Sequence, residues 1–270
     1  MTQTAYQRRA RRALERQLVY QQRKAEMLRG HEDEVVARMA EHSQEVRDKI
    51  AAVHAIPADA RVLEVGSGAH GLIFFFDAAE RVGVDPLADH YKSLFPAWQG
   101  KARTIAAHGE QLPFDDASFD VVLCDNVVDH AESPRQIIRE IIRVLAPGGL
   151  LYFTVNVHHP FYQLAASVHA GWRALGIPFE ISPFADHTVH FTPAAARRLF
   201  DGLGLRILKD SDTVNETRRT PPAPARHPGD HLKRLFYKNA TWELIAAKDG
   251  DGPSASGSLE ERTNRRRSRG

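Results

Sequence analysis

Apolar runs alternate with helical segments along the chain from residue 61 onward. The run FDVVLCD at 119–125 is continuous and apolar, which is typical of a strand buried on both faces of a sheet. Alternating strands and helices predict a parallel sheet with helices on both sides. The predicted strands are 61–65, 81–85, 103–107, 119–125, 150–157, 205–210 and 240–248.

Capping residues mark two of the predicted helices. SPRQIIREIIRVLAPGG at 133–149 places Ser133 at the N-cap and ends in the helix-breaking residues 147–149. TPAAARRLFDGLG at 192–204 predicts a further helix with Thr192 as its N-cap.

The N-terminal residues 5–54 predict two helices, the first strongly basic and ending at Gly30. In the second helix, apolar residues recur at helical spacing on one face: Val35, Met39, Val46, Ile50 and Val53. The last segment, from 249 onward, has almost nothing to bury. We therefore predict a helical lid at 1–56, a main domain at 57–248 and a disordered tail at 249–270.

Composition and charge narrow the cellular context. The chain has 270 residues, 43% of them hydrophobic, which suffices for one large core. Its net charge of +2 gives no field that would draw it onto nucleic acid or acidic lipid, so we interpret the basic first helix as a solvated face. The single cysteine, Cys124, excludes an internal disulfide. Neither a secretory signal nor an apolar run of about 20 residues is found, which predicts a cytoplasmic protein without a membrane span.

The stretch VLEVGSGAHG at 62–71 joins the first strand to a turn with the spacing G-x-G-x-x-G. Glycine is used where the backbone takes positive φ or approaches another group closely. A strand that ends in such a turn is typical of a nucleotide-type ligand site. The residues after it, LIFFFDAAE at 72–80, predict a short helix whose phenylalanines pack against the sheet. A dinucleotide dehydrogenase would use the same turn for a pyrophosphate.

Four segments resemble the class I S-adenosylmethionine-dependent methyltransferases, in the small-molecule branch of the type 11-like group. They are LEVGSGAHG, GVDPL, HGEQLPFDDASFDVVLCDNVVDH and EIIRVLAPGGLLYF, in this order within 61–153. The resemblance implies a Rossmann-like seven-stranded sheet, mostly parallel with an antiparallel last strand. It identifies 57–248 as the methyltransferase domain and implies S-adenosylmethionine as cofactor and S-adenosylhomocysteine as product.

The resemblance also places residues at the cofactor, and their chemistry suits it. Glu64 brings negative charge near the ammonium and sulfonium groups, and Asp85 can accept both ribose hydroxyls. Leu87 can lie against the adenine. His108 stands where the family commonly has an acidic residue, so Gly109 and Glu110 are expected to make that contact instead. The residues predicted at the cofactor are Glu64, Gly66, Ser67, Gly68, His70, Asp85, Pro86, Leu87, His108, Gly109, Glu110, Asp125, Asn126 and His130.

Several features of the sequence bear on the methyl acceptor. DNA amino-methyltransferases of this fold carry D/N-P-P-Y/F after the fourth strand, where this chain reads DNVV. Cys124 lies inside that strand, which indicates a core residue rather than a nucleophile. Both observations argue against nucleic acid as the methyl acceptor. The segment 156–191 is rich in histidine and aromatic residues, which is typical of a small-molecule pocket.

A histidine is the expected general base, because its pKa near neutrality suits proton removal from a hydroxyl or an ammonium. We rank His158 or His159 first, since they leave the fifth strand at the ligand edge, and His130 second. His187 and His190 could pair on a metal, but without cysteine ligands we favour a structural role and predict no metal. Two alternatives stay open: a protein or RNA acceptor, and a non-catalytic protein that binds S-adenosylmethionine.

Overall fold

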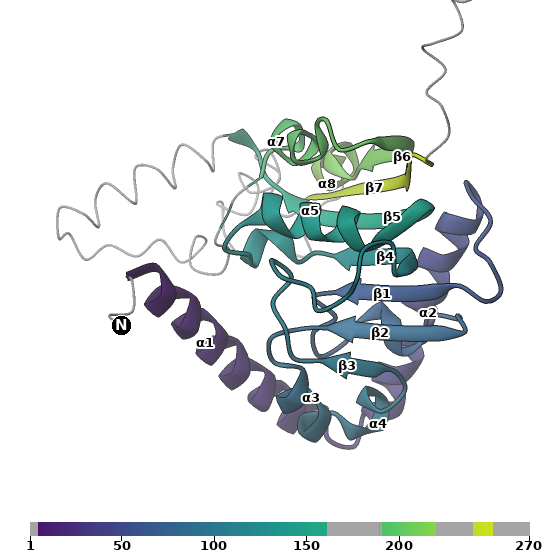
Figure 1. Cartoon of the computed structure of the whole chain (residues 1–270). Helices are drawn as coiled ribbons and strands as arrows, with labels where there is room; N and C mark the ends of the chain where they lie inside the picture. The colour runs from purple at the N-terminus through teal and green to yellow at the C-terminus, as the bar shows by residue number, and fades with distance from the viewer. Residues whose placement is uncertain (1–4, 161–188, 190, 220–239, 251–270) are drawn as a thin grey trace, which may run out of the picture.

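A computed structural model describes residues 5–160, 189, 191–219 and 240–250 (Figure 1). These residues form a seven-stranded sheet in the order β3-β2-β1-β4-β5-β7-β6. Neighbouring strands from β3 to β5 are parallel, whereas β7 is antiparallel to both β5 and β6. The predicted Rossmann-like sheet with an antiparallel last strand is therefore confirmed. The strands are β1 (Arg61–Val65), β2 (Glu80–Val84), β3 (Arg103–Ile105), β4 (Phe119–Asp125), β5 (Leu145–Val157), β6 (Leu205–Asp212) and β7 (Ala240–Lys248).

Helices cover both faces of the sheet, as predicted. On one face Ile138 and Ile141 of α5 pack on the sheet, and on the other Val46 and Ile50 of α2 do so. The helices are α1 (Ala5–Leu28), α2 (Glu32–Ala51), α3 (Ala88–Leu94), α4 (Pro96–Gln99), α5 (Pro134–Val144), α7 (Pro193–Arg197) and α8 (Val214–Arg219). Short 3₁₀ turns are η1 (Leu72–Phe74), η2 (Val128–His130) and η4 (Arg198–Phe200).

The helix predicted after the glycine turn is reduced to the single turn η1. Phe74 and Phe76 are buried in the core, as expected, so the packing prediction holds although the helix prediction does not. The face beside η1 is already occupied by α2, whose Ser43 hydroxyl donates to the Leu72 carbonyl at 3.0 Å. A helix from earlier in the chain thus takes space that a longer helix here would need.

The helix predicted to run to residues 147–149 ends at Val144, and β5 begins directly after it. Lys248, the last residue of β7, helps to end the helix at this point. Its ammonium donates to the carbonyls of Ile142 and Leu145 at 2.7 Å each and so satisfies the helix end from another strand. The Thr192 cap is confirmed, because its hydroxyl accepts from the Ala195 amide at 3.2 Å.

The first helix extends toward the ligand edge of the sheet. In Figure 1, α1 lies on the side to which β1, β2 and β3 point, and it contacts α3. Leu14, Leu18 and Leu28 pack against the core, and Gln21 is buried. These contacts support the prediction of a lid, which stays a prediction.

No helix within the described ranges is long and apolar enough to cross a membrane. Cys124 is fully buried in β4, and burial raises the pKa of its thiol, which fits a core residue.

Candidate active site at the carboxyl edge of the sheet

The turn after β1 needs its glycines. Gly66 and Gly68 have φ of +75° and +55°, a region that side chains disfavour. A Cβ on Gly66 would lie 2.4 Å from both methyl groups of Val127, which follows β4. The amides of Gly66 and Ser67 both donate to the Val84 carbonyl, at 2.7 and 3.1 Å. The turn is therefore held tightly between the ends of β2 and β4.

Glu64 holds the far end of this turn. Its two carboxyl oxygens accept from the amides of Leu72 and Ile73 at 3.1 and 2.9 Å. Burial raises the pKa of Glu64 to about 8. A Cβ on Gly71 would lie 2.3 Å from one of the carboxyl oxygens. The sequence suggested only a partner for the cofactor's positive groups, and it missed this role in the turn itself.

Asp85 follows β2 and joins two backbone segments at the same edge. One oxygen accepts from the Leu87 amide at 2.8 Å and the other from the Gly68 amide at 3.1 Å. Burial raises the pKa of Asp85, and the nearby His108 acts in the opposite direction. A carboxylate has about four lone-pair sites, so two stay available for ribose hydroxyls. Pro86 and Leu87 continue from it, and Leu87 is buried.

Aromatic rings enclose His70, the side chain in the middle of the turn. Its ring centroid lies 4.9 Å from that of Phe95 and 5.3 Å from that of Trp98. Burial lowers the pKa of His70 to about 4, so the imidazole is neutral at physiological pH. The Trp98 indole and the Gln99 amide both donate to the Ala69 carbonyl. The sequence gave no local signal for these two residues, which come from α4.

Buried polar atoms at the turn test whether it suits a polar ligand. The Ser67 hydroxyl, Nε2 of His70 and Oε1 of Gln99 are buried and have no hydrogen-bond partner in the described structure. Buried polar groups in proteins are normally satisfied. Three such atoms around one glycine turn fit a ligand that carries amino, carboxylate and hydroxyl groups, as S-adenosylmethionine does.

The loop predicted at the adenine edge lies close to β1. A Cβ on Gly109 would be 3.0 Å from a Val65 methyl, so this position favours glycine. The Glu110 carboxylate accepts from the amides of Glu132 and Ser133 at 3.1 and 3.3 Å, which ties the loop to the start of α5. Its predicted contact with adenine stays untested, and His108 is exposed at the loop's beginning.

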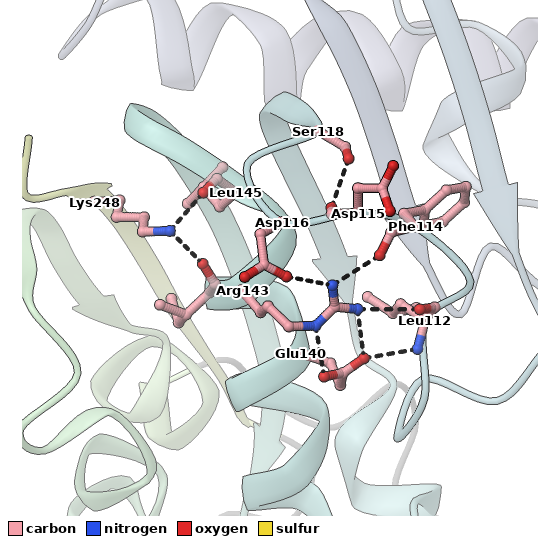
Figure 2. Close-up of polar contacts among 10 residues, drawn as sticks. Leu112, Phe114, Asp115, Asp116, Ser118, Glu140, Arg143, Leu145 and Lys248 are labelled. Carbon is pink, nitrogen blue, oxygen red and sulfur yellow. Dashed lines mark hydrogen bonds and ion pairs between the residues drawn. The ribbon is translucent and has the colours of Figure 1, made fainter.

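Arg143 of α5 anchors the rest of this loop, as Figure 2 shows. Its guanidinium donates to the carbonyls of Leu112 and Phe114 and to the carboxylates of Asp116 and Glu140, at 2.7–3.1 Å. Glu140 also accepts from the Leu112 amide at 2.9 Å. These bonds fix the loop to the scaffold although Arg143 itself lies away from the turn.

The residues after β4 form the second half of the edge. Asn126 has a φ of +57°, and its side chain accepts from the Asn156 amide at 3.1 Å. Asp125 accepts from the Thr154 hydroxyl with one oxygen, and its other oxygen lies 3.3 Å from Nε2 of His42. The sequence analysis missed His42, because α2 reaches this edge only through the tertiary fold.

The three predicted base candidates lie at or near this half of the edge. His158 directly follows β5 and is 2% exposed, with its backbone amide donating to the Phe191 carbonyl at 2.8 Å. His159 is partly buried, and the side chain of His130 is 52% exposed, with Nε2 3.8 Å from Asp129. His187, His190 and most of the aromatic segment lie outside the described residues. Among the residues that the structure does describe, no group of three or more histidine, cysteine, aspartate or glutamate side chains could hold a metal ion.

Comparison with known proteins agrees with this geometry. Residues 63–153 match a family described as a methyltransferase domain. An uncharacterized methyltransferase from Mycobacterium sp. strain JLS is 38% identical over 113 residues, which cover 40% of this chain and 43% of the relative. The chain thus spans less than half the length of the curated relatives it matches.

Two solved structures share the fold at low sequence identity. Geranyl diphosphate C-methyltransferase from Streptomyces coelicolor, in complex with Mg²⁺, geranyl diphosphate and S-adenosylhomocysteine, has a TM-score of 0.53 at 14% identity, covering 80% of this chain and 83% of that one. The [4+2]-cyclase SpnF has a TM-score of 0.51 at 18% identity, covering 76% and 80%. The second structure shows that the fold alone does not fix the reaction.

Proposed function

We propose that this chain, whose residues 63–153 match the methyltransferase domain family, is a class I enzyme that transfers a methyl group from S-adenosylmethionine to an oxygen or nitrogen atom of a small molecule. The observation that carries the proposal is the glycine turn, where Asp85 accepts from the Gly68 amide and buried polar atoms of Ser67 and His70 have no hydrogen-bond partner in the described structure. A pyrophosphate would keep Glu64, whose pKa burial raises to about 8, in its neutral form, whereas the ammonium group of S-adenosylmethionine would favour its carboxylate.

Each residue at the turn has a defined part in holding the cofactor. Asp85 accepts the ribose hydroxyls with its remaining lone pairs while it keeps the Gly68 amide in place. Glu64 lies under the turn, where its ionised form is favoured by the cofactor's ammonium group. Gly66 and Gly68 let the ligand approach the backbone. When bound, S-adenosylmethionine supplies an electrophilic methyl carbon on a sulfonium.

The protein's remaining task is to align the acceptor and remove its proton. Alignment of the reacting atoms contributes much of the rate in such displacements. We propose that a histidine at the β4 and β5 ends takes the proton, and the sequence offers His130, His158 and His159 for this role. The structure adds His42 to the same edge.

The first experiment measures binding and transfer separately. Isothermal titration with S-adenosylhomocysteine is expected to give a micromolar Kd, and incubation with methyl-labelled S-adenosylmethionine and a metabolite extract is expected to label a small molecule. Tight binding of NADH without binding of S-adenosylhomocysteine would reject the proposal. Stabilisation by S-adenosylhomocysteine without transfer to any extract component would favour the non-catalytic alternative.

A protein or RNA acceptor is the second candidate, suggested by the arginine-rich first helix and the RRRSR motif near the end of the chain. Deletion of 251–270 distinguishes the two candidates. If the acceptor is a small molecule, the deletion should leave the activity unchanged. If the acceptor is a protein or RNA held by the arginines of this segment, the deletion should abolish methyl transfer. The assay compares label in the extract's small molecules with label in its protein and RNA.

A further inference from the structure

His42 reaches the end of β4 from a helix that is 83 residues earlier in the chain. Its Nε2 lies 3.3 Å from Asp125, and the second oxygen of Asp125 accepts from the Thr154 hydroxyl on β5. Asp125 and Thr154 are directly paired in the sheet. The three side chains form a continuous chain of hydrogen bonds, which we call the His42 relay.

The relay sets the tautomer of the imidazole. A hydrogen bond to a carboxylate places the proton on Nε2, which leaves the lone pair on Nδ1. Thr154 occupies the other carboxylate oxygen and so restrains the orientation of Asp125. The same arrangement, in which a carboxylate orients a histidine and stabilises its protonated form, underlies general-base catalysis in other enzymes.

The relay's position points to the reaction rather than to stability. Asp125 lies two residues before Val127, whose methyl groups fix the closest approach to Gly66. His42 therefore lies at the same end of β4 as the turn, because Asp125 and Val127 both stand at that end. The His42 side chain is 51% exposed, and exposed ion pairs of this kind contribute little to folding stability. Val46 and Ile50 already hold α2 to the sheet.

We propose that His42 is the general base of the methyl transfer, with Asp125 and Thr154 as positioning residues; this rests on the proposed function. The acceptor's lone pair forms the bond to the methyl carbon while the carbon–sulfur bond breaks, and the electron pair of that bond stays on sulfur. The acceptor's proton passes to Nδ1 of His42, and the imidazolium formed is stabilised by Asp125 at Nε2 and by Glu45, whose Oε2 lies 3.7 Å from Nδ1. Water then takes the proton away. The assignment differs from the histidines that the sequence suggested.

The charges around His42 support proton uptake. The hydrogen bond to Asp125 raises the pKa of His42, and Glu45 on the same helix, with Oε2 3.7 Å from Nδ1, adds to the rise against the effect of burial. Glu64 of β1 and Tyr152 of β5 interact electrostatically with Asp125. The base must be neutral to act, so the rate is expected to rise with pH through a pKa above the ordinary value of 6.5.

The kinetic test compares His42→Ala with a matched control, His31→Ala. His31 lies at the start of α2 and also pairs with a glutamate three residues on, Glu34. With the acceptor labelled by the wild-type protein, His42→Ala is expected to lose about 10²- to 10⁴-fold in kcat and to lose the rise with pH, while its Kd for S-adenosylhomocysteine is unchanged. Added imidazole should restore part of the rate. Asp125→Asn should move the pH profile to lower pH.

Equal kcat for His42→Ala and wild type would overturn the assignment of His42 and leave the proposed function intact. A wild-type protein that transfers no label would instead contradict the proposed function, and the base assignment with it. An NMR titration of the His42 ring tests whether His42 lies near the cofactor's methyl group, and it needs no methyl acceptor. The sulfonium of S-adenosylmethionine should lower the pKa of His42 relative to the neutral thioether of S-adenosylhomocysteine, and identical values would place His42 away from the methyl group.

Discussion

The two halves of the carboxyl edge are built in different ways. The half that we propose for the cofactor is a backbone turn, with Gly66 and Gly68 in positive φ and with nearby amides bonded to Glu64 and Asp85. The half that we propose for the acceptor consists of side chains from separate elements, such as His42 on α2 and Asp125 on β4. One half depends on local sequence and the other on tertiary packing.

This difference suits the two ligands. A fixed cofactor can be held by a rigid turn, whose geometry a short motif specifies. An acceptor differs between enzymes, so its contacts come from elements whose sequence can change without disturbing the turn. We therefore expect substitutions in the cofactor half to affect binding and folding together, and substitutions in the acceptor half to affect turnover alone.

Among substitutions in the cofactor half, the largest effect is expected for Asp85→Ala. In the proposed site it removes the acceptor for two ribose hydroxyls, worth about 3 kcal/mol together, so Kd for S-adenosylhomocysteine should rise roughly 100-fold or more by calorimetry. Asp89→Ala is the control, because Asp89 makes only an exposed ion pair with Lys92 in α3. Unchanged binding by Asp85→Ala would mean that the cofactor's sugar lies elsewhere.

Gly71→Ala tests whether the turn is as tight as the structure indicates. The new methyl group would lie 2.3 Å from the Glu64 carboxyl, so the free energy of unfolding in urea should fall by about 1–3 kcal/mol. Gly100→Ala is the matched control, since a Cβ there meets nothing within 4 Å. Equal stability of the two variants would show that the turn relaxes easily.

Arg143→Met tests whether the loop that Arg143 anchors contributes to cofactor binding. Loss of the bonds to Leu112, Phe114 and Asp116 should loosen the loop and raise Kd for S-adenosylhomocysteine about tenfold, at a cost of about 1–2 kcal/mol in unfolding free energy. Arg139→Met on the exposed side of α5 should change neither quantity. Arg143→Met with wild-type affinity would indicate that the loop does not contact the cofactor.

The smallest effect concerns the proton of Glu64. A folded pKa of about 8, above the ordinary 4.5, means that the folded state binds more protons in this range, so stability of the free protein should fall as pH rises from about 4.5 to 8. An ammonium group bound near Glu64 favours the carboxylate. S-adenosylhomocysteine binding at pH 7 should therefore release up to about one proton, measured by calorimetry in buffers of different ionisation enthalpy.

Glu64→Gln is the control for this measurement, because the amide cannot titrate. It should bind S-adenosylhomocysteine without any dependence on the buffer. A wild-type binding enthalpy that is the same in all buffers would show that Glu64 does not lie near the ammonium group of the ligand.

The sequence by itself predicted the seven strands, the glycine turn and the N-cap at Thr192, because these depend on neighbouring residues and their periodicity. The structure ends β3 earlier, at Ile105, begins β5 earlier, at Leu145, and extends β6 to Asp212. The sequence also placed Asp85 at the turn, since strand ends in a parallel sheet meet at one edge. Its prediction of a helix at 72–80 was too long, because nothing in those residues reveals that α2 packs beside η1.

Only the tertiary structure decided where α5 ends and which histidine meets Asp125. Lys248 satisfies the end of α5 from β7, and His42 approaches β4 across 83 residues of chain. Neither contact leaves a trace in local sequence. The physical reason is that backbone geometry is set by a residue and its neighbours, whereas side-chain partners are set by which surfaces the fold buries together.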